Sequence, residues 1–176
     1  MLPLSPAADY RLPSEALSTT KHNVHIQRTL CINQQHLLFM AYCPQTTKED
    51  ILLLDSDILF DPKVITELLQ SEKADTLAVN KHKLGEEEIK VIADAEGKII
   101  EISKTCSISQ AMGESIGIEK MSAAYTDALF QELDVMIRQE KLDNIFYEGA
   151  FERLIPQGYS FIRRTPRSFS QLSWTP

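Results

Sequence analysis

The sequence predicts an α/β fold in which helices flank a sheet that contains an inserted β-hairpin. Residues 51–54 form a continuous apolar run, which is typical of a strand buried on both faces. An amphipathic helical stretch and a second apolar strand follow over residues 62–72 and 74–79, and this order predicts a β-α-β unit with a right-handed crossover and parallel strands. Two short alternating segments, residues 88–94 and 98–103, flank an Asp-Ala-Glu-Gly turn signal and predict the hairpin.

Length, charge and cysteine content narrow the class of protein. The chain has 176 residues, a formal net charge of −7 and a pI of about 5.1. This length suits a single domain with a real core, and the acidic balance argues against a general nucleic-acid-binding surface. The three cysteines form no CxxC pair, no apolar run approaches the length of a membrane span, and no secretory signal is evident at the N-terminus. We therefore expect a cytoplasmic protein with neither nucleic-acid nor membrane partners.

The most informative stretch lies at the end of the first predicted strand, where Leu54 is followed by Asp55, Ser56 and Asp57. Two carboxylates one residue apart at the carboxyl end of a strand can hold a hard cation such as Mg²⁺, with phosphate oxygens as further ligands. Asp61 as an N-cap, with proline next to it at the first helical position, predicts the helix start just beyond. Because Asp and Ser are also common in turns, a plain strand-to-turn ending is the alternative.

The second half of the chain predicts a strand, two helical stretches and a last strand. Residues 112–121 form the first strand, with glycines near both ends that would permit a close approach by a ligand or another backbone. Ser122 is the expected N-cap of a helix over 123–141. A second helical stretch is expected over 143–154, and a last apolar strand over 159–162.

Composition divides the chain into three segments. Residues 1–47 are rich in Pro, Ser and Thr near their start, and we expect a poorly ordered or atypical segment with at most a short strand at 22–32 and a helix at 34–42. Residues 48–162 form the expected α/β domain. Residues 163–176 contain three arginines and no acid, and we expect a frayed tail.

From residue 49 to about residue 160 the order of elements resembles the middle of a sugar-phosphate nucleotidyltransferase. The likeness is to the small cytidylyltransferase-like branch that acts on phosphocholine or related phosphorylated alcohols. It rests on residues 53–60, on the end of the hairpin at 97–104, and on the strand at 113–118. The resemblance implies a Rossmann-like mixed sheet of the GT-A or nucleotidyltransferase type with flanking helices.

The resemblance also implies the catalytic and metal-binding residues. Asp57 best matches the aspartate that binds the catalytic Mg²⁺, and Asp55 would be a supporting carboxylate at the same metal. Lys104 would offset the charge of a substrate phosphate.

The hairpin and the strand after it would form the wall of the acceptor pocket. Glu114, Ser115 and Glu148 are the implied substrate-binding residues. Glu148 is also the only acidic candidate near the place where the family supplies a second acidic metal ligand. The basic residues 81–83 precede the hairpin, and they are either a solvated loop or a phosphate contact close to the metal.

The implied reaction is Mg²⁺-dependent transfer of a nucleoside monophosphate from a nucleoside triphosphate, with CTP favoured, to a phosphorylated small alcohol or sugar, with release of pyrophosphate. Two departures from the family stand against full activity. Residues 1–47 contain no glycine and so no glycine-rich loop to grip a triphosphate, and residues 159–164 carry arginines where the family supplies a second acidic metal ligand. We therefore expect an incomplete or frame-shifted member with weak or no turnover.

Other functions share the Asp-x-Asp signature. A metal-dependent nucleotide-sugar glycosyltransferase of the GT-A type holds its metal in this way, and a catalytically inactive remnant would keep the motif without the activity. A haloacid-dehalogenase-like phosphatase normally has glycine after the second aspartate, whereas Ile58 follows here.

Strands left exposed at the sheet edges would also favour a homo-oligomer.

Overall fold

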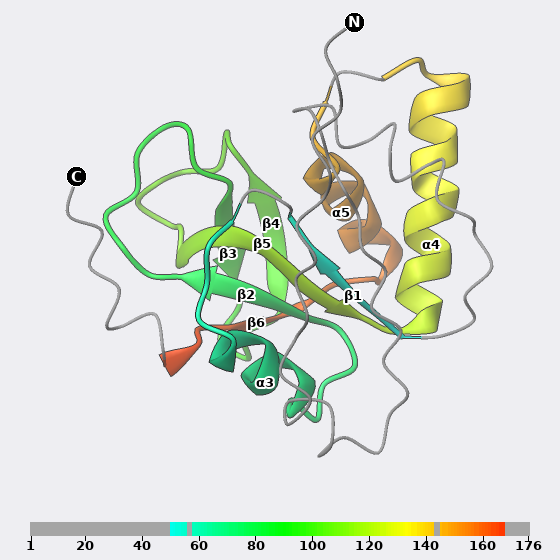
Figure 1. The fold of residues 1–176 in the computed structure, drawn as a ribbon. Coiled ribbons are helices and arrows are strands. Elements are labelled where there is room, and N and C mark those ends of the chain that lie inside the picture. Colours follow the sequence, from blue (N-terminus) through cyan, green and yellow to red (C-terminus); the bar gives the residue numbers. More distant parts are fainter. Residues whose placement is uncertain (1–49, 56–57, 143–144, 168–176) are drawn as a thin grey trace, which may run out of the picture.

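The structure of the protein is a computed structural model that describes residues 50–55, 58–142 and 145–167 (Figure 1). The strand expected at 22–32 and the helix expected at 34–42 lie outside these residues, as do Ser56 and Asp57.

Within the described residues, six strands and five helical segments follow one another. The strands are β1 (Ile51–Leu54), β2 (Thr76–Asn80), β3 (Lys90–Ala93), β4 (Ile99–Ser103), β5 (Gly113–Met121) and β6 (Ile162–Arg164). The helical segments are α3 (Lys63–Leu69), α4 (Ala123–Asp134), the π-helical turn η1 (Val135–Gln139), α5 (Glu148–Leu154) and the 3₁₀ turn η2 (Ile155–Gln157). None of these helices is both long and apolar enough to cross a bilayer.

One mixed sheet contains all six strands, and β5 lies in its middle. β1 and β3 pair with one edge of β5, and β2 pairs with the other edge, each in antiparallel orientation. β4 extends the sheet beyond β3, and β6 pairs in parallel with β2. The predicted α/β fold with a mixed sheet, flanking helices and an inserted hairpin is confirmed. β1 and β2 run in the same direction, as predicted, but they are not neighbours because β5 lies between them.

Two apolar layers cover the two faces of the sheet. Alternate residues of a strand point to opposite faces, so Ala78 of β2 packs with α3, while Leu77 and Val79 pack with the layer of α4 and α5. Figure 1 shows α3 on one side of the sheet and α4 and α5 on the other. The amphipathic pattern that predicted α3 also predicted its buried side chains, which are Val64, Ile65, Leu68 and Leu69.

Local capping and turn chemistry account for the element boundaries. The carboxylate of Asp61 accepts a hydrogen bond of 2.9 Å from the Lys63 N–H, so it caps the start of α3. Ser122 accepts one of 3.2 Å from the Tyr125 N–H and caps α4 as expected. In the hairpin turn, Asp94 Oδ1 accepts from the Lys98 N–H at 2.8 Å, and Gly97 has the positive φ of 84° that the turn requires.

The helices after β5 are shorter than predicted. The α-helix expected over 123–141 ends at Asp134 and continues as the π-helical turn η1. Of the helical stretch expected over 143–154, α5 occupies only Glu148–Leu154, and residues 143–144 lie outside the described part.

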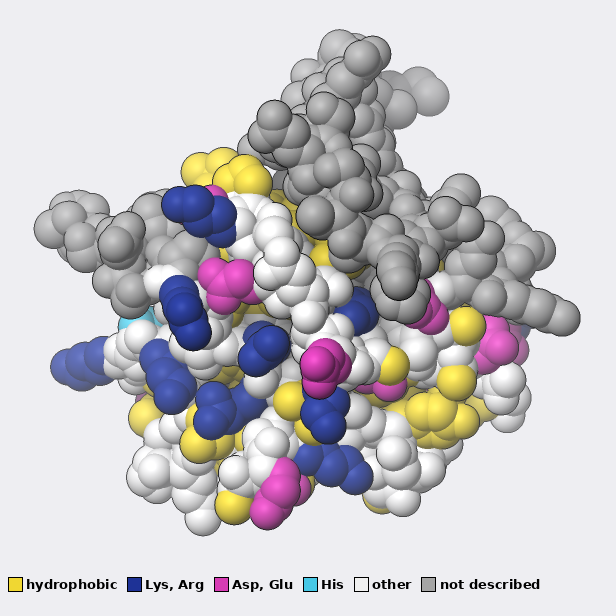
Figure 2. Space-filling model, turned by 90° about the horizontal axis from the view of Figure 1, so that it is seen from below, with side chains coloured by type: hydrophobic (Ala, Val, Ile, Leu, Met, Phe, Trp, Pro, Cys, Tyr) yellow, Lys and Arg dark blue, Asp and Glu magenta, His cyan; other side chains and the backbone are white. Residues whose placement is uncertain are grey.

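The last strand lies further along the chain than expected. β6 spans Ile162–Arg164, so the sheet continues two residues past residue 162, where the sequence placed the end of the domain. Phe161 just before it is buried and stacks on Tyr125 at 4.3 Å between ring centroids. Arg163 and Arg164 therefore belong to the edge strand rather than to a frayed tail. Figure 2 shows Lys and Arg side chains gathered on the side of the molecule where α3 and β6 lie.

Candidate active site

Asp55 lies directly after β1, against the middle of β5. Its N–H donates a hydrogen bond of 2.8 Å to the carbonyl of Gly117, and its Oδ1 accepts one of 3.1 Å from the hydroxyl of Tyr147. Gly117 has a φ of 67°, and a Cβ there would collide with the Asp55 carboxylate. Glycine at this position therefore lets β5 pass close to the aspartate, as the sequence pattern suggested.

Two further carboxylates are buried around the same tyrosine. Glu119 of β5 has no exposed surface, and neither of its carboxylate oxygens has a well-formed hydrogen bond. Burial raises the pKa of Glu119 well above its ordinary value; the charges of Asp55 and Glu148 add to the rise, and Ser115 and Tyr147 oppose part of it. Burial likewise raises the pKa of Glu148 at the start of α5 to about 7, with a further contribution from Asp55. We call Asp55, Glu119 and Glu148 the carboxylate cluster.

Lys104 lies at the edge of the carboxylate cluster. Its Nζ lies 4.7 Å from the ring centroid of Phe146, two residues before Glu148, and its charge opposes the rise in the pKa of Glu148. The same Nζ forms an ion pair of 3.3 Å with Glu87 in the loop before β3. A substrate phosphate could take the place of this exposed carboxylate.

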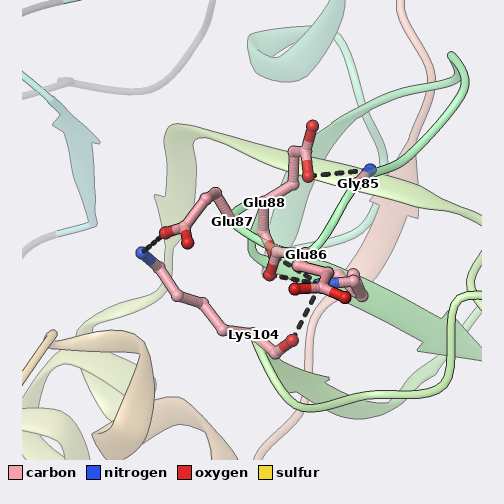
Figure 3. A network of polar contacts seen from close by, with 6 residues as sticks. Gly85, Glu86, Glu87, Glu88 and Lys104 are labelled. Carbon is pink, nitrogen blue, oxygen red and sulfur yellow. Dashed lines mark hydrogen bonds and ion pairs between the residues drawn. The ribbon is translucent and has the colours of Figure 1, made fainter.

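A buried lysine that the sequence did not single out joins the backbone of Lys104 to the loop before β3. Figure 3 shows Lys104 and residues 85–88 of this loop. The ammonium of Lys90, on β3, donates to the carbonyls of Lys104 at 2.7 Å, Glu86 at 2.9 Å and Glu88 at 3.2 Å. Lys90 is only 1% exposed, so these carbonyls replace the water that its charge has lost. The signal in the sequence is a lysine between Ile89 and Val91 in a strand that is otherwise apolar.

The structure separates the two predicted acceptor-binding residues of β5. Ser115 is buried on the same face of β5 as Glu119. Glu114 shares the opposite face with Ile116, which packs in the α3 layer, and its Oε2 lies 2.7 Å from Nε2 of His82. Of the predicted site residues, Asp55, Lys104, Ser115 and Glu148 therefore gather near Tyr147, while Glu114 lies elsewhere. Asp57 lies outside the described residues.

The donor set of the carboxylate cluster suits a hard cation, although it does not enclose one. Among residues 50–55, 58–142 and 145–167, no group of three or more His, Cys, Asp or Glu side chains is arranged to hold a metal ion. Mg²⁺ commonly needs only one or two protein carboxylates when substrate phosphates supply other oxygens. Asp55, at the end of its strand, fits that role.

Comparisons with known proteins rest on structure alone, because no family model and no curated protein sequence matches the chain. The inositol-1-phosphate CTP transferase from T. maritima aligns with a TM-score of 0.53 and 18% identity over 73% of this chain and 49% of its own. The CTP:phosphocholine cytidylyltransferase LicC from Streptococcus pneumoniae aligns with a TM-score of 0.50 and 12% identity over 65% of this chain and 47% of its own. The fold is that of the nucleotidyltransferases.

The same nucleotidyltransferase fold is shared with a CMP:2-keto-3-deoxy-manno-octonic acid synthetase, solved in complex with CTP. That structure aligns with a TM-score of 0.50 and 12% identity over 76% of this chain and 60% of its own. The chain thus spans about half the length of the first two structures and somewhat more of the third. The fold implied by residues 53–60, 97–104 and 113–118 is confirmed.

Replacing Lys90 by Met should destabilise the fold and loosen the loop before β3. The three carbonyls would lose a charged donor, which we expect to lower the free energy of unfolding by about 2 kcal/mol. Urea unfolding would measure this change, and hydrogen exchange at residues 85–89 should become faster than in the unaltered protein. Lys98→Met, at an exposed turn position, is the matched control and should change neither quantity; equal stability of the two variants would contradict the role of Lys90.

Ionisation of Glu148 should lower stability as the pH rises. In the folded protein Glu148 keeps its proton up to a pKa of about 7, whereas the ordinary pKa is 4.5. Between these two pH values the unfolded chain therefore binds fewer protons than the folded protein, and the free energy of unfolding falls as the pH rises. The shift corresponds to about 3 kcal/mol. Relative to the unaltered protein, Glu148→Gln should therefore gain stability between pH 5 and pH 8.5.

Urea unfolding at these two pH values, without divalent cations, would measure the gain. Glu96→Gln, at the exposed hairpin turn, is the control, and its stability relative to the unaltered protein should be the same at both pH values. A Glu148→Gln variant whose stability relative to the unaltered protein is the same at pH 5 and pH 8.5 would show that the buried carboxyl is not protonated in the folded state.

Proposed function

We propose that this chain carries out or supports nucleotidyl transfer from a nucleoside triphosphate, with CTP favoured, to a phosphorylated small alcohol or sugar. The observation that supports this proposal most strongly is the position of Asp55. It lies at the end of β1, beside Tyr147 and the buried Glu148, in a fold of the nucleotidyltransferase type. Two of the similar structures are a CTP transferase and a CTP:phosphocholine cytidylyltransferase, and a third was solved with CTP, which supports the choice of nucleotide.

The chemistry of this reaction asks for positioning and charge neutralisation. An oxygen of the acceptor phosphate attacks the α-phosphorus, the bond between the α-phosphorus and the bridging oxygen breaks, and pyrophosphate leaves with that electron pair. Asp55, together with Asp57, would hold Mg²⁺, which when bound neutralises phosphate charge. Lys104 would leave Glu87 and contact a phosphate.

Glu148 has the properties of a group that recognises substrate. With a pKa of about 7, its carboxyl exists in both protonation states near neutral pH and can donate or accept a hydrogen bond. Its Oε2 is buried without a hydrogen-bond partner, so a substrate hydroxyl or cation could satisfy it. Strongly perturbed carboxyls of this kind occur preferentially at functional sites.

A GT-A glycosyltransferase is the second candidate. The spacing of Asp55 and Asp57 suits the metal of a nucleotide-sugar complex equally well, and residues 1–47 contain no glycine-rich triphosphate loop. The two reactions differ in the nucleotide that binds with Mg²⁺. CTP for the first and a UDP-sugar for the second are therefore the informative ligands.

The full chain should bind CTP in a Mg²⁺-dependent manner and release pyrophosphate slowly when phosphocholine or another phosphorylated alcohol is added. Asp55→Asn should weaken Mg²⁺-dependent CTP binding by about tenfold or more, because a charged contact to the metal is lost. Calorimetry and a coupled pyrophosphate assay would measure these quantities.

Asp127→Asn, on an exposed position of α4, is the control for loss of one negative charge and should bind CTP normally. Binding of a UDP-sugar but not of CTP would replace the first function by the second. Binding of neither in the presence of Mg²⁺ would identify the chain as an inactive relative.

A further inference from the structure

A cavity lies where the loop after β2 faces the segment that leads into β5. Its volume is about 510 Å³, within the usual range for small-molecule sites. Lys81, His82 and Leu84 line one side, and residues 110–113 line the other. All of these residues are described by the structure and none belongs to the carboxylate cluster.

The loop side of the cavity is cationic in a chain that is acidic as a whole. Lys81 and Lys83 are exposed, and neither has an ion pair or hydrogen bond through its side chain with any residue in the described part of the chain. Lys63, Lys104, Arg138 and Arg153, by contrast, each pair with a carboxylate. A hollow beside an uncompensated ammonium attracts anions.

His82 is hydrogen-bonded through both ring nitrogens. Its Nδ1 lies 2.9 Å from the carbonyl oxygen of Lys83, and its Nε2 lies 2.7 Å from Oε2 of Glu114. The carbonyl can only accept, so Nδ1 donates to it, and a protonated ring forms an ion pair with Glu114 that neutralises that carboxylate. Partial burial lowers the pKa of His82, but the hydrogen bonds to Glu114 and Lys83 and the charges of Glu114 and Glu88 outweigh this effect and raise it.

The other lining residues are apolar or uncharged, and a close backbone contact between β5 and β2 lies behind them. Leu84, Ala111 and Met112 supply carbon surface, and Gln110 supplies an amide. A Cβ on Gly113 would collide with the carbonyl oxygen of Asn80, so glycine lets β5 close against the end of β2. The cavity is therefore built for a ligand with one anionic end and a short carbon body.

We propose that this cavity binds a small phosphomonoester, with Lys81 as its cationic contact, His82 neutralising the nearby carboxylate of Glu114, and Leu84 and Met112 against its carbon atoms. A phosphomonoester carries nearly two negative charges above pH 6, so an uncompensated ammonium attracts it more strongly than it attracts a carboxylate. Binding at the cavity requires neither nucleotide nor Mg²⁺, so it can be tested apart from the proposed function.

Propyl phosphate is a suitable probe, with 1-propanol and inorganic phosphate as its two halves. NMR titration of the full chain at pH 7, without nucleotide or metal, should shift the amides of residues 110–113 on addition of propyl phosphate. We expect inorganic phosphate to bind at least about threefold more weakly, because the apolar contacts are lost, and 1-propanol to cause no shift. Equal affinity for propyl phosphate and inorganic phosphate, or shifts confined to other parts of the molecule, would overturn the proposal.

Neighbouring lysines provide a matched pair of variants. Lys81→Ala should weaken propyl phosphate binding by about tenfold, since a charge-assisted contact is lost. Lys83→Ala removes the same charge from the same loop, but Lys83 does not line the cavity, so the loss should stay below about threefold. Equal losses in the two variants would indicate general charge attraction instead of a site.

The pH dependence tests the role of His82. The groups that face it are Glu114 on β5, Glu88 in the loop before β3, and Lys81 and Lys83 beside it. Binding should weaken as the pH rises through the raised pKa of His82, because the ring loses its proton and leaves the negative charge of the Glu114 carboxylate uncompensated. His82→Gln should bind weakly at neutral and alkaline pH alike; an unchanged affinity in this variant would exclude this role of His82.

Discussion

The pairing of β5 with three other strands is the constraint on which the rest of the structure depends. β1, β2 and β3 all form antiparallel ladders with this one strand, so its path sets the positions of the others. Two glycines make the path possible. Gly113 passes against the backbone of Asn80, and Gly117 passes against the carboxylate of Asp55. Because β5 carries Glu119 beside this contact, the same strand brings the carboxylate cluster together.

The buried charged groups on the two sides of the candidate active site differ in how their hydrogen bonds are satisfied. The ammonium of Lys90 is satisfied by three carbonyls and joins the loop before β3 to the end of β4. Glu119 and Glu148 are buried with oxygens that lack hydrogen-bond partners. Such carboxyls cost stability when ionised, and strongly perturbed carboxyls occur preferentially at functional sites. Lys104 at the edge of the carboxylate cluster, next to these buried carboxyls, supports the proposal of a substrate that has both phosphate and hydroxyl or cationic groups.

The sequence predicted the elements well because their signals are local. Alternating apolar residues, the Asp94–Gly97 turn and the Ser122 cap each act within a few residues, and all appear in the structure. The neighbours of β1 could not be predicted, because β5 enters between β1 and β2 from about 60 residues later in the chain. The position of β6 was also missed, since Arg163 and Arg164 looked like a charged tail.

The candidate site was only partly predictable for a similar reason. Asp55 and Lys104 follow recognisable strand-end and motif signals, whereas Glu148 was named only as the nearby acidic candidate. Glu119 and Lys90 did not stand out, because their importance arises from burial, which depends on the packing of distant elements. Glu114 and Ser115 are adjacent in β5, and the alternation of a strand sends adjacent side chains to opposite faces. Their roles in substrate binding stay predictions.

The proposed function requires that the end of β1 holds a divalent cation together with a nucleotide. Paramagnetic broadening by Mn²⁺, as a substitute for Mg²⁺, would test this most directly in the full chain with CTP present. We expect broadening of the amides of Asp55, Gly117 and Glu148, which lie around the carboxylate cluster. Broadening that instead centres on the exposed acidic loop at residues 86–88, or that is the same with and without CTP, would contradict it.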